Sequence, residues 1–136
     1  MRTLLTFIAF FLMLSIATIP AQASSSEVSD EITVIAVKMD AEWCGKCKVM
    51  NPKLESIMPS FKDESILFLK LNMTDEFTTQ QAGLLAERLQ LTDLFNEHKG
   101  RTGYMVLVDA KTGESLKTLQ STLSEEELKA EIKSVL

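Results

Sequence analysis

The sequence is poor in the residues from which most catalytic and nucleic-acid-binding sites are built. It has a single histidine, His98, and no serine–histidine–aspartate set, phosphate-binding loop or carboxylate pair stands out along its 136 residues. Its 14 lysines and arginines form no cluster, and against 19 acidic residues they leave a formal net charge of −5. A chain of this charge offers no basic surface to nucleic acid or to an anionic membrane. These shortages argue against hydrolytic, phosphate-binding and nucleic-acid-binding functions.

Cysteine is scarce as well, but its placement is informative. The two cysteines, Cys44 and Cys47, are separated only by Gly45 and Lys46. A disulfide that stabilises a small domain usually closes a long loop, because the loss of unfolded-state entropy grows with loop length. A bridge across two residues constrains almost nothing, so a structural role explains this pair poorly. Cysteines at this spacing are more often a redox site.

Charge is almost absent from the N-terminal segment, where Arg2 is the one charged residue before Glu27. Residues 4–19 are almost wholly apolar, Pro20 interrupts them, and Ala21-Gln22-Ala23 supplies the small residues that a signal peptidase recognises. We therefore predict a secretory signal peptide. The alternative is an uncleaved membrane anchor, although the apolar run is somewhat short for a membrane span.

The predicted organisation is a signal peptide over residues 1–23, a mobile leader over 24–31 and one domain over 32–136. We expect an exported protein, in a bacterial periplasm, with no membrane contact after cleavage. In such a compartment thiols meet an oxidising environment and tend to be paired.

Hydrophobic patterns predict an α/β domain with the order β-α-β-α-β-β-α. Strands are expected at 32–37, at 65–72 (apolar enough to be buried on both faces), at 104–108, and at 114–119 after a hairpin loop over 109–113. The first two strands, joined by a helix, should be parallel.

Four helical segments are expected between and after these strands. The first begins at Cys44, contains Pro52, and buries an apolar face formed by Cys47, Met50, Leu54, Ile57, Met58 and Phe61. Thr78 or Thr79 is expected to cap the second, whose buried face would be Ala82, Leu85, Ala86 and Leu89. Thr92-Asp93 would cap an extra helical segment before the third strand, and the final helix starts at a capping box at Ser124.

The cysteine pair falls at the junction of the first strand and the first helix. A cysteine at a helix N-terminus lies at the positive end of the helix dipole, which stabilises its thiolate. We therefore expect Cys44 to be partly exposed and to act as the attacking thiol. Cys47, one turn further, would resolve the mixed disulfide, so that the reaction is thiol–disulfide exchange.

The residues around the pair resemble the thioredoxin family. The resemblance is carried by the run from Ala41 to Lys48, in which Trp43 directly precedes Cys44, by Pro52 within the helix, and by Lys70-Leu71-Asn72 at the end of the second strand. It implies a thioredoxin-like fold, with a central mixed four-stranded sheet flanked by helices. It also implies an oxidoreductase that acts on protein thiols and disulfides with no cofactor beyond its own Cys44–Cys47 disulfide. Trp43, Gly45 and Lys46 are then supporting residues of the site.

Two positions depart from the family pattern. The family's cis-proline, which opens the third strand opposite the cysteines, is replaced by Gly103 after Thr102, and we expect a trans peptide bond there. The family's buried acid is replaced by Lys38, and Lys70 aligns with the lysine that pairs with that acid. The two lysines would lower the pKa values of the cysteines or supply an amine base. Alternatively, Lys38 extends to solvent.

Three functions remain open on the sequence alone. The first is a monomeric protein-disulfide reductase, which needs a membrane or periplasmic electron donor. The second is a copper(I)-binding or metal-delivery protein, in which Met39, Met50 and Met73 complete a soft site around the cysteines. However, these methionines also fit core positions, so no metal site is predicted. The third is a thioredoxin-like binding module in which the inserted helix between Asp75 and Gly100 contacts a partner. His98 is expected to cap a helix end rather than to bind a metal.

Overall fold

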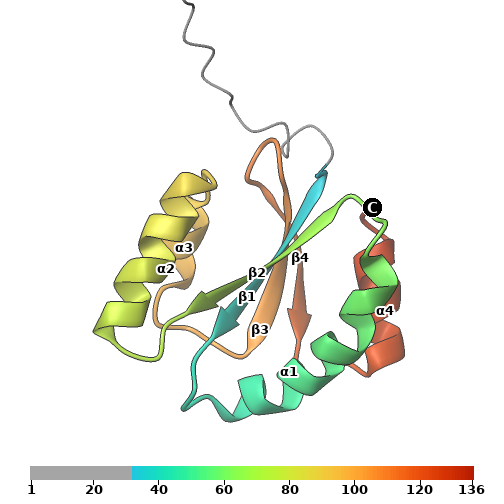
Figure 1. The fold of residues 1–136 in the computed structure, drawn as a ribbon, viewed down its shortest axis with the longest axis horizontal. Coiled ribbons are helices and arrows are strands. Elements are labelled where there is room, and N and C mark those ends of the chain that lie inside the picture. The colour runs from blue at the N-terminus through green and yellow to red at the C-terminus, as the bar shows by residue number, and fades with distance from the viewer. Residues whose placement is uncertain (1–31) are drawn as a thin grey trace, which may run out of the picture.

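The computed structural model describes residues 32–136, so the predicted signal peptide and leader lie outside the described residues. Four strands form one sheet in the order β2-β1-β3-β4 (Figure 1), and their bounds are β1 Val34–Asp40, β2 Ile66–Asn72, β3 Tyr104–Asp109 and β4 Ser115–Gln120. The helices are α1 Gly45–Ile57, followed by the 3₁₀ turn η2 Met58–Phe61, then α2 Glu76–Arg88, α3 Thr92–His98 and α4 Glu125–Lys133. This order confirms the predicted thioredoxin-like α/β fold, including the extra helix before the third strand.

The sheet is mixed, as predicted. Strand β1 is parallel to β2 and antiparallel to β3, and β3 is antiparallel to β4. β1 is central and buried along its whole length, which suits its β-branched and small apolar residues. The hairpin between β3 and β4 closes at Gly113, whose φ of +73° is unfavourable for residues with a side chain.

Helices cover both faces of the sheet (Figure 1). On one face, α1 and α4 bury Met50, Leu54 and Leu128 against even-numbered residues of β1 such as Ala36. On the other face, α2 and α3 bury a second cluster that includes Val37 of β1. The alternation of side chains along a strand assigns each β1 residue to one layer or the other. Lys38 and Asp40 therefore belong to the α1 face.

Several local predictions were wrong. β2 is an edge strand and is only half-buried over Leu67–Leu69, because no strand lies beyond it. Leu85 is 41 % exposed and Met58 is 40 % exposed, since α2 packs on the sheet through Ala82 and Ala86, and since Met58 begins the 3₁₀ turn after α1 ends.

The caps of α2 and α3 also differ from the prediction. Asp75, not Thr78 or Thr79, is the N-cap of α2, and it forms a reciprocal capping box with Thr78. The shorter α3 begins after Leu91 without a side-chain cap. Among residues 32–136, no helix has the length and apolar character needed to cross a membrane.

Candidate active site

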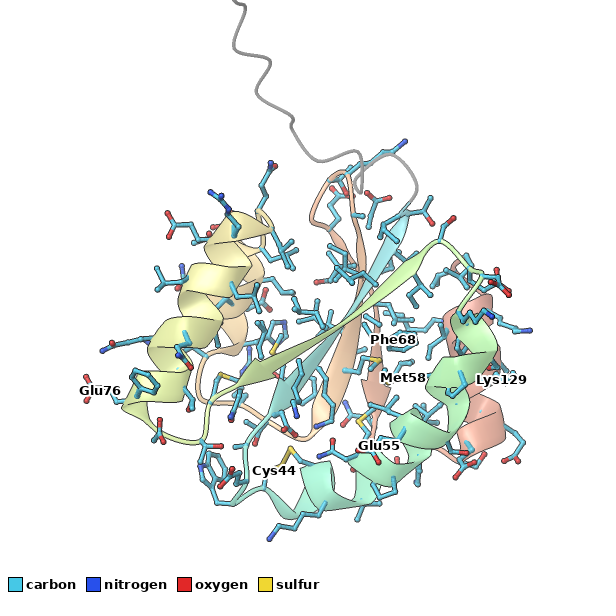
Figure 2. All side chains as sticks on the ribbon, in the orientation of Figure 1. Cys44, Glu55, Met58, Phe68, Glu76 and Lys129 are labelled. Atoms are coloured by element: carbon cyan, nitrogen blue, oxygen red, sulfur yellow. A yellow bond between two sulfur atoms is a disulfide. The ribbon has the colours of Figure 1, made fainter. Side chains whose placement is uncertain are left out.

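The two cysteines form a disulfide at the N-terminal end of α1, beside the carboxyl end of β1 (Figure 2). Cys44 is the N-cap residue of α1, with extended backbone angles, and the backbone N–H of Cys47 donates to Cys44 Sγ at 3.1 Å. Their Cα atoms are 5.2 Å apart. The predicted pairing at a strand–helix junction is therefore present. The same N–H is positioned to stabilise a thiolate on Cys44 once the bond is reduced.

Both cysteines are more enclosed than expected. Cys44 is 6 % exposed and Cys47 is 1 % exposed, so the predicted partial exposure of Cys44 was too high. The Cys47 sulfur lies 3.7 Å from the carbonyl oxygen of Met39, which could accept a hydrogen bond from the reduced thiol. Of the two residues, Cys44 is the more exposed, and it is the one predicted to be the attacking thiol.

The segment before the disulfide is fixed to the end of β2. Trp43 Nε1 donates to the carbonyl oxygen of Thr74 at 2.9 Å, and the backbone N–H of Glu42 donates to Thr74 Oγ1 at 3.0 Å. Asn72 Oδ1 in turn accepts from Thr74 Oγ1 at 2.6 Å. Trp43 remains 60 % exposed, so an indole surface lies beside the disulfide. The contact of Thr74 with Glu42 and Trp43 was not predicted, because no motif marks Thr74 in the sequence.

Gly103 faces the disulfide from the loop before β3. Its φ is +94°, all peptide bonds of residues 32–136 are trans, and its N–H donates to the Met39 carbonyl at 3.0 Å. The position of a Cβ atom on Gly103 would lie 3.3 Å from Cys44 Sγ. The structure thus brings Gly103 to the cysteines, as expected, with the half-buried Thr102 directly before it. Gly45, the first residue of α1, has no neighbour within 4 Å of a built Cβ atom.

The two lysines predicted near the site do not form an isolated repulsive pair. Lys38 and Lys70 are register partners on β1 and β2. However, Lys38 is 4 % exposed and its amine donates to Asp40 Oδ1, while Lys70 Nζ lies 4.0 Å from Asp40 Oδ2. Asp40 is itself buried, so a carboxylate lies between the two ammonium groups.

Asp40 was missed because the first strand was predicted to end at Val37, whereas it continues to Asp40. With the longer strand, the alternation of side chains would have placed Lys38 and Asp40 on one face. The alternative in which Lys38 extends to solvent is wrong. Burial lowers the pKa of Lys38, and the hydrogen bond and charge of Asp40 oppose that shift, while Lys70 adds to it.

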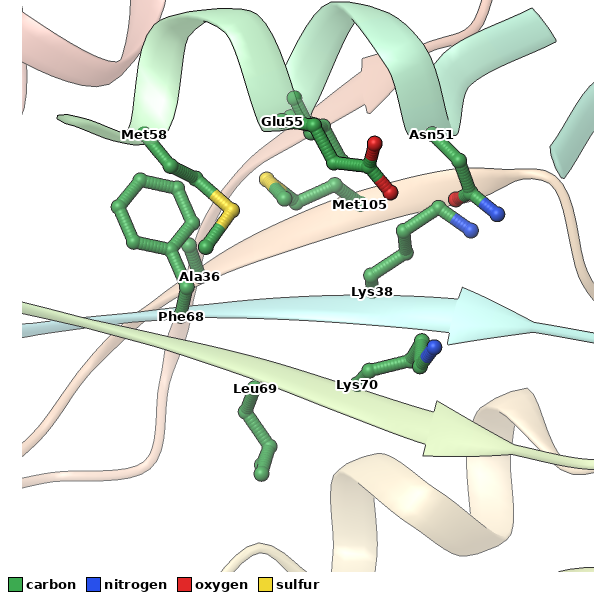
Figure 3. Close-up of a pocket in the computed structure, with 10 residues that line it drawn as sticks. Ala36, Lys38, Asn51, Glu55, Met58, Phe68, Leu69, Lys70 and Met105 are labelled. Atoms are coloured by element: carbon green, nitrogen blue, oxygen red, sulfur yellow. The ribbon is translucent and has the colours of Figure 1, made fainter. Parts of the chain in front are cut away.

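A pocket of about 230 Å³ opens beside this pair, between α1 and the strands β1 and β2 (Figure 3). Lys38 and Lys70 line its polar end together with Asn51 of α1, and Met58 and Phe68 line its apolar end. The pocket therefore borders Lys38, and neither cysteine lines it.

The remaining predicted groups do not join the site. Met50 is buried on the α1 face, whereas Met39 and Met73 are buried on the opposite face of the sheet, so the three cannot converge on one copper ion. His98 is the last residue of α3 and is hydrogen-bonded through Nδ1 to the Tyr104 hydroxyl at 2.8 Å. Among residues 32–136, no group of three or more histidine, cysteine or carboxylate residues is arranged to hold a metal ion.

A disulfide at a helix N-terminus, with Cys47 fully enclosed and Cys44 slightly exposed, is suited to exchange with thiols. Fold and site together define a thioredoxin-like domain with a Cys-x-x-Cys disulfide at the start of its first helix.

Comparison with known proteins agrees with this class. The sequence model of the family described as Thioredoxin matches residues 15–84, about half of the chain, and the chain belongs to the thioredoxin family. Over 77 residues it is 31 % identical to "Thioredoxin F, chloroplastic" of Oryza sativa subsp. japonica. That match covers 44 % of this chain and 40 % of the rice protein, so the chain spans less than half of that relative.

The solved structure of oxidised thioredoxin from Plasmodium falciparum is similar in fold. It has a TM-score of 0.50 at 20 % sequence identity, over 79 % of this chain and 84 % of that one.

Proposed function

We propose that the protein is an exported, monomeric protein-disulfide reductase that uses Cys44 as the attacking thiol and Cys47 as the resolving thiol. The observation that carries this proposal is the difference between the two sulfurs: Cys44 caps α1 and accepts the Cys47 N–H, whereas Cys47 is fully enclosed. The more exposed Cys44 is therefore the cysteine that we assign to the contact with a partner disulfide.

The proposed reaction proceeds in two exchanges. The Cys44 thiolate attacks one sulfur of the partner disulfide, and the other partner sulfur leaves as a thiolate that takes up a proton. Cys47, deprotonated, then attacks Cys44 Sγ, which releases the second partner thiol and forms the Cys44–Cys47 disulfide. The partner gains two electrons and the cysteine pair loses two. A dithiol electron donor, in the membrane or the periplasm, must then reduce the pair again.

Turnover of a protein disulfide tests the activity itself. Insulin reduction in the presence of dithiothreitol should be accelerated by the wild type, and neither Cys44→Ser nor Cys47→Ser should sustain this catalysis. If both single variants keep the wild-type rate, the cysteine pair is idle, and the binding-module alternative is supported instead.

The direction of electron flow requires a separate measurement. A reductase should have a potential near that of thioredoxin, about −270 mV, whereas a value near −120 mV would indicate an oxidant of the DsbA kind. Equilibration in thiol buffers of known poise, with Trp43 fluorescence as the signal, gives this value, since Trp43 directly precedes Cys44. A potential above about −180 mV would contradict the proposed direction.

Export is proposed from the N-terminal sequence alone. Expression of the full chain in a bacterium should yield a periplasmic protein that begins at Ser24. An intact N-terminus in the membrane fraction would favour the anchor, and an intact N-terminus in the cytosol would contradict export.

A further inference from the structure

Lys46, between the two cysteines, lies across Gly103 next to the reactive sulfur. A Cβ atom on Gly103 would be 2.6 Å from Lys46 Cβ, 3.1 Å from Lys46 Cδ and 3.3 Å from Cys44 Sγ. The aliphatic part of Lys46 therefore occupies the space beside Gly103 that a side chain on residue 103 would need. This packing keeps the first part of the lysine side chain within reach of Cys44, while the residue as a whole stays exposed.

The charge of Lys46 is not neutralised by its surroundings. Its amine forms no ion pair with any residue of the described range 32–136, and the first turn of α1 contains no acid. Glu42, two residues before Cys44, is exposed, and the Asp75 carboxylate is engaged by the N–H and hydroxyl of Thr78. Although the net charge of the protein is negative, Lys46 therefore places a positive charge on the Gly103 side of the disulfide.

We propose that Lys46 is a specificity-determining residue, which favours partners that carry an acidic side chain next to the cysteine that reacts with Cys44. This inference rests on the proposed function, because it concerns the partner in the same exchange. An opposite charge a few ångströms from the reacting atoms lowers the free energy of the encounter, and a like charge raises it. The neighbouring Lys48 is equally exposed but lies two residues further along α1, where it faces a different direction.

The oxidised protein and three small thiols of similar size provide the test. The thiols are 2-mercaptoethanesulfonate (anionic), 2-mercaptoethanol (neutral) and cysteamine (cationic). In each case the thiolate attacks Cys44 Sγ and Cys47 leaves as a thiolate. A second thiol then releases Cys44 and is itself oxidised to the small-molecule disulfide. The rate constants are followed by Trp43 fluorescence, and the ratio of the anionic to the cationic rate is compared between variants.

Lys46→Met keeps the aliphatic side chain over Gly103 and removes the charge, so the anionic-to-cationic ratio should fall about fivefold at low ionic strength. Lys46→Arg should keep the wild-type ratio, Lys48→Met should change it little, and added salt should reduce the wild-type ratio toward that of Lys46→Met. The absolute rate with 2-mercaptoethanol controls for damage to the site.

The result that overturns the proposal is an unchanged ratio in Lys46→Met, or an equal loss in Lys48→Met. Either outcome leaves insulin reduction by the wild type intact and therefore leaves the proposed function standing. If the wild type is inactive toward insulin as well, the proposed function itself has failed.

Discussion

The buried ion pair Lys38–Asp40 is the first residue-scale feature with a testable effect on stability. An ion pair with little exposure is held by the mutual attraction of its members, and removal of one partner leaves the other charge buried and uncompensated. Lys70, 62 % exposed in its side chain, is too solvated to replace Lys38 as the partner of Asp40.

We therefore expect Asp40→Asn to lower the free energy of unfolding by about 3 kcal/mol at pH 7. The loss should shrink at alkaline pH. Without Asp40, burial acts unopposed and keeps the pKa of Lys38 below 10.5, so the folded protein binds fewer protons than the unfolded one and its stability rises with pH. Urea unfolding at several pH values measures this.

The double variant Lys38→Met/Asp40→Asn is the control, because it removes both charges and should recover most of the lost stability. Equal stability of Asp40→Asn and wild type would contradict a buried pair. Lys38 and Lys70 are predicted to lower the pKa values of the cysteines or to supply an amine base, and then Lys38→Ala changes the pH dependence of thiol alkylation at Cys44 and Cys47; an unchanged profile would rule that role out.

Gly103 provides a second residue-scale prediction. Gly103→Ala should destabilise the oxidised protein by about 1–3 kcal/mol, because its φ of +94° is unfavourable for alanine and because the new methyl group would meet Lys46 Cβ at 2.6 Å. Chemical denaturation of both variants measures it. Gly45→Ala is the matched control and should be nearly neutral, since nothing lies within 4 Å of its Cβ position. A neutral Gly103→Ala would mean that the loop has room to rearrange.

At the scale of elements, the end of α3 is linked to the start of β3 by His98 and Tyr104. Their rings are 5.6 Å apart, and the hydrogen bond between them spans the loop that carries Gly103. Burial lowers the pKa of His98 below its usual 6.5; Glu97 opposes this shift, while Arg101 adds to it. This link is therefore weakened by acid.

We expect the free energy of unfolding to decrease as the pH falls below about 6.5, since the unfolded chain then binds the His98 proton more readily than the folded one. The decrease should continue until the lower, folded-state pKa is passed. His98→Gln should remove this part of the pH dependence, as His98 is the one histidine of the chain. Tyr104→Phe should keep most of this pH dependence, and its free energy of unfolding at pH 8 should be about 1 kcal/mol lower than that of the wild type. An unchanged slope in His98→Gln would contradict the account.

Element boundaries explain what could and could not be predicted from the sequence. The order of elements followed from periodicity, and the capping box at Ser124 marked the start of α4 correctly. The prediction ended the first strand before Asp40, because a polar residue inside a strand breaks the apolar pattern. In the structure, a hydrogen bond from Lys38 satisfies the buried Asp40 carboxylate. The exposure of Leu85 follows from packing of α2 through two alanines, a choice that helical periodicity does not encode.

At the scale of the whole molecule, the disulfide lies at the edge of the sheet where the parallel strands β1 and β2 end. The carboxyl end of β1, the start of α1 and the loop before β3 meet at Cys44, and the start of α2, where Glu76 lies, is joined to the same edge through Thr74 (Figure 2). Three parts of the chain that are distant in sequence, around residues 39–47, 72–76 and 103, therefore meet at the disulfide. The motif predicted the thioredoxin family and the disulfide, whereas the enclosure of Cys44 by Gly103 and Lys46 required the structure.

Cys44 is proposed to attack and Cys47 to resolve the mixed disulfide, and trapping of that intermediate distinguishes the two roles. The reduced Cys47→Ser and Cys44→Ser variants are each mixed with a disulfide-bonded peptide, and covalent products are identified by mass spectrometry under non-reducing conditions. We predict that Cys47→Ser accumulates a one-to-one adduct through Cys44 that dithiothreitol releases, whereas Cys44→Ser forms almost none. Equal trapping by both variants, or trapping only through Cys47, would mean that Cys44 is not the attacking thiol.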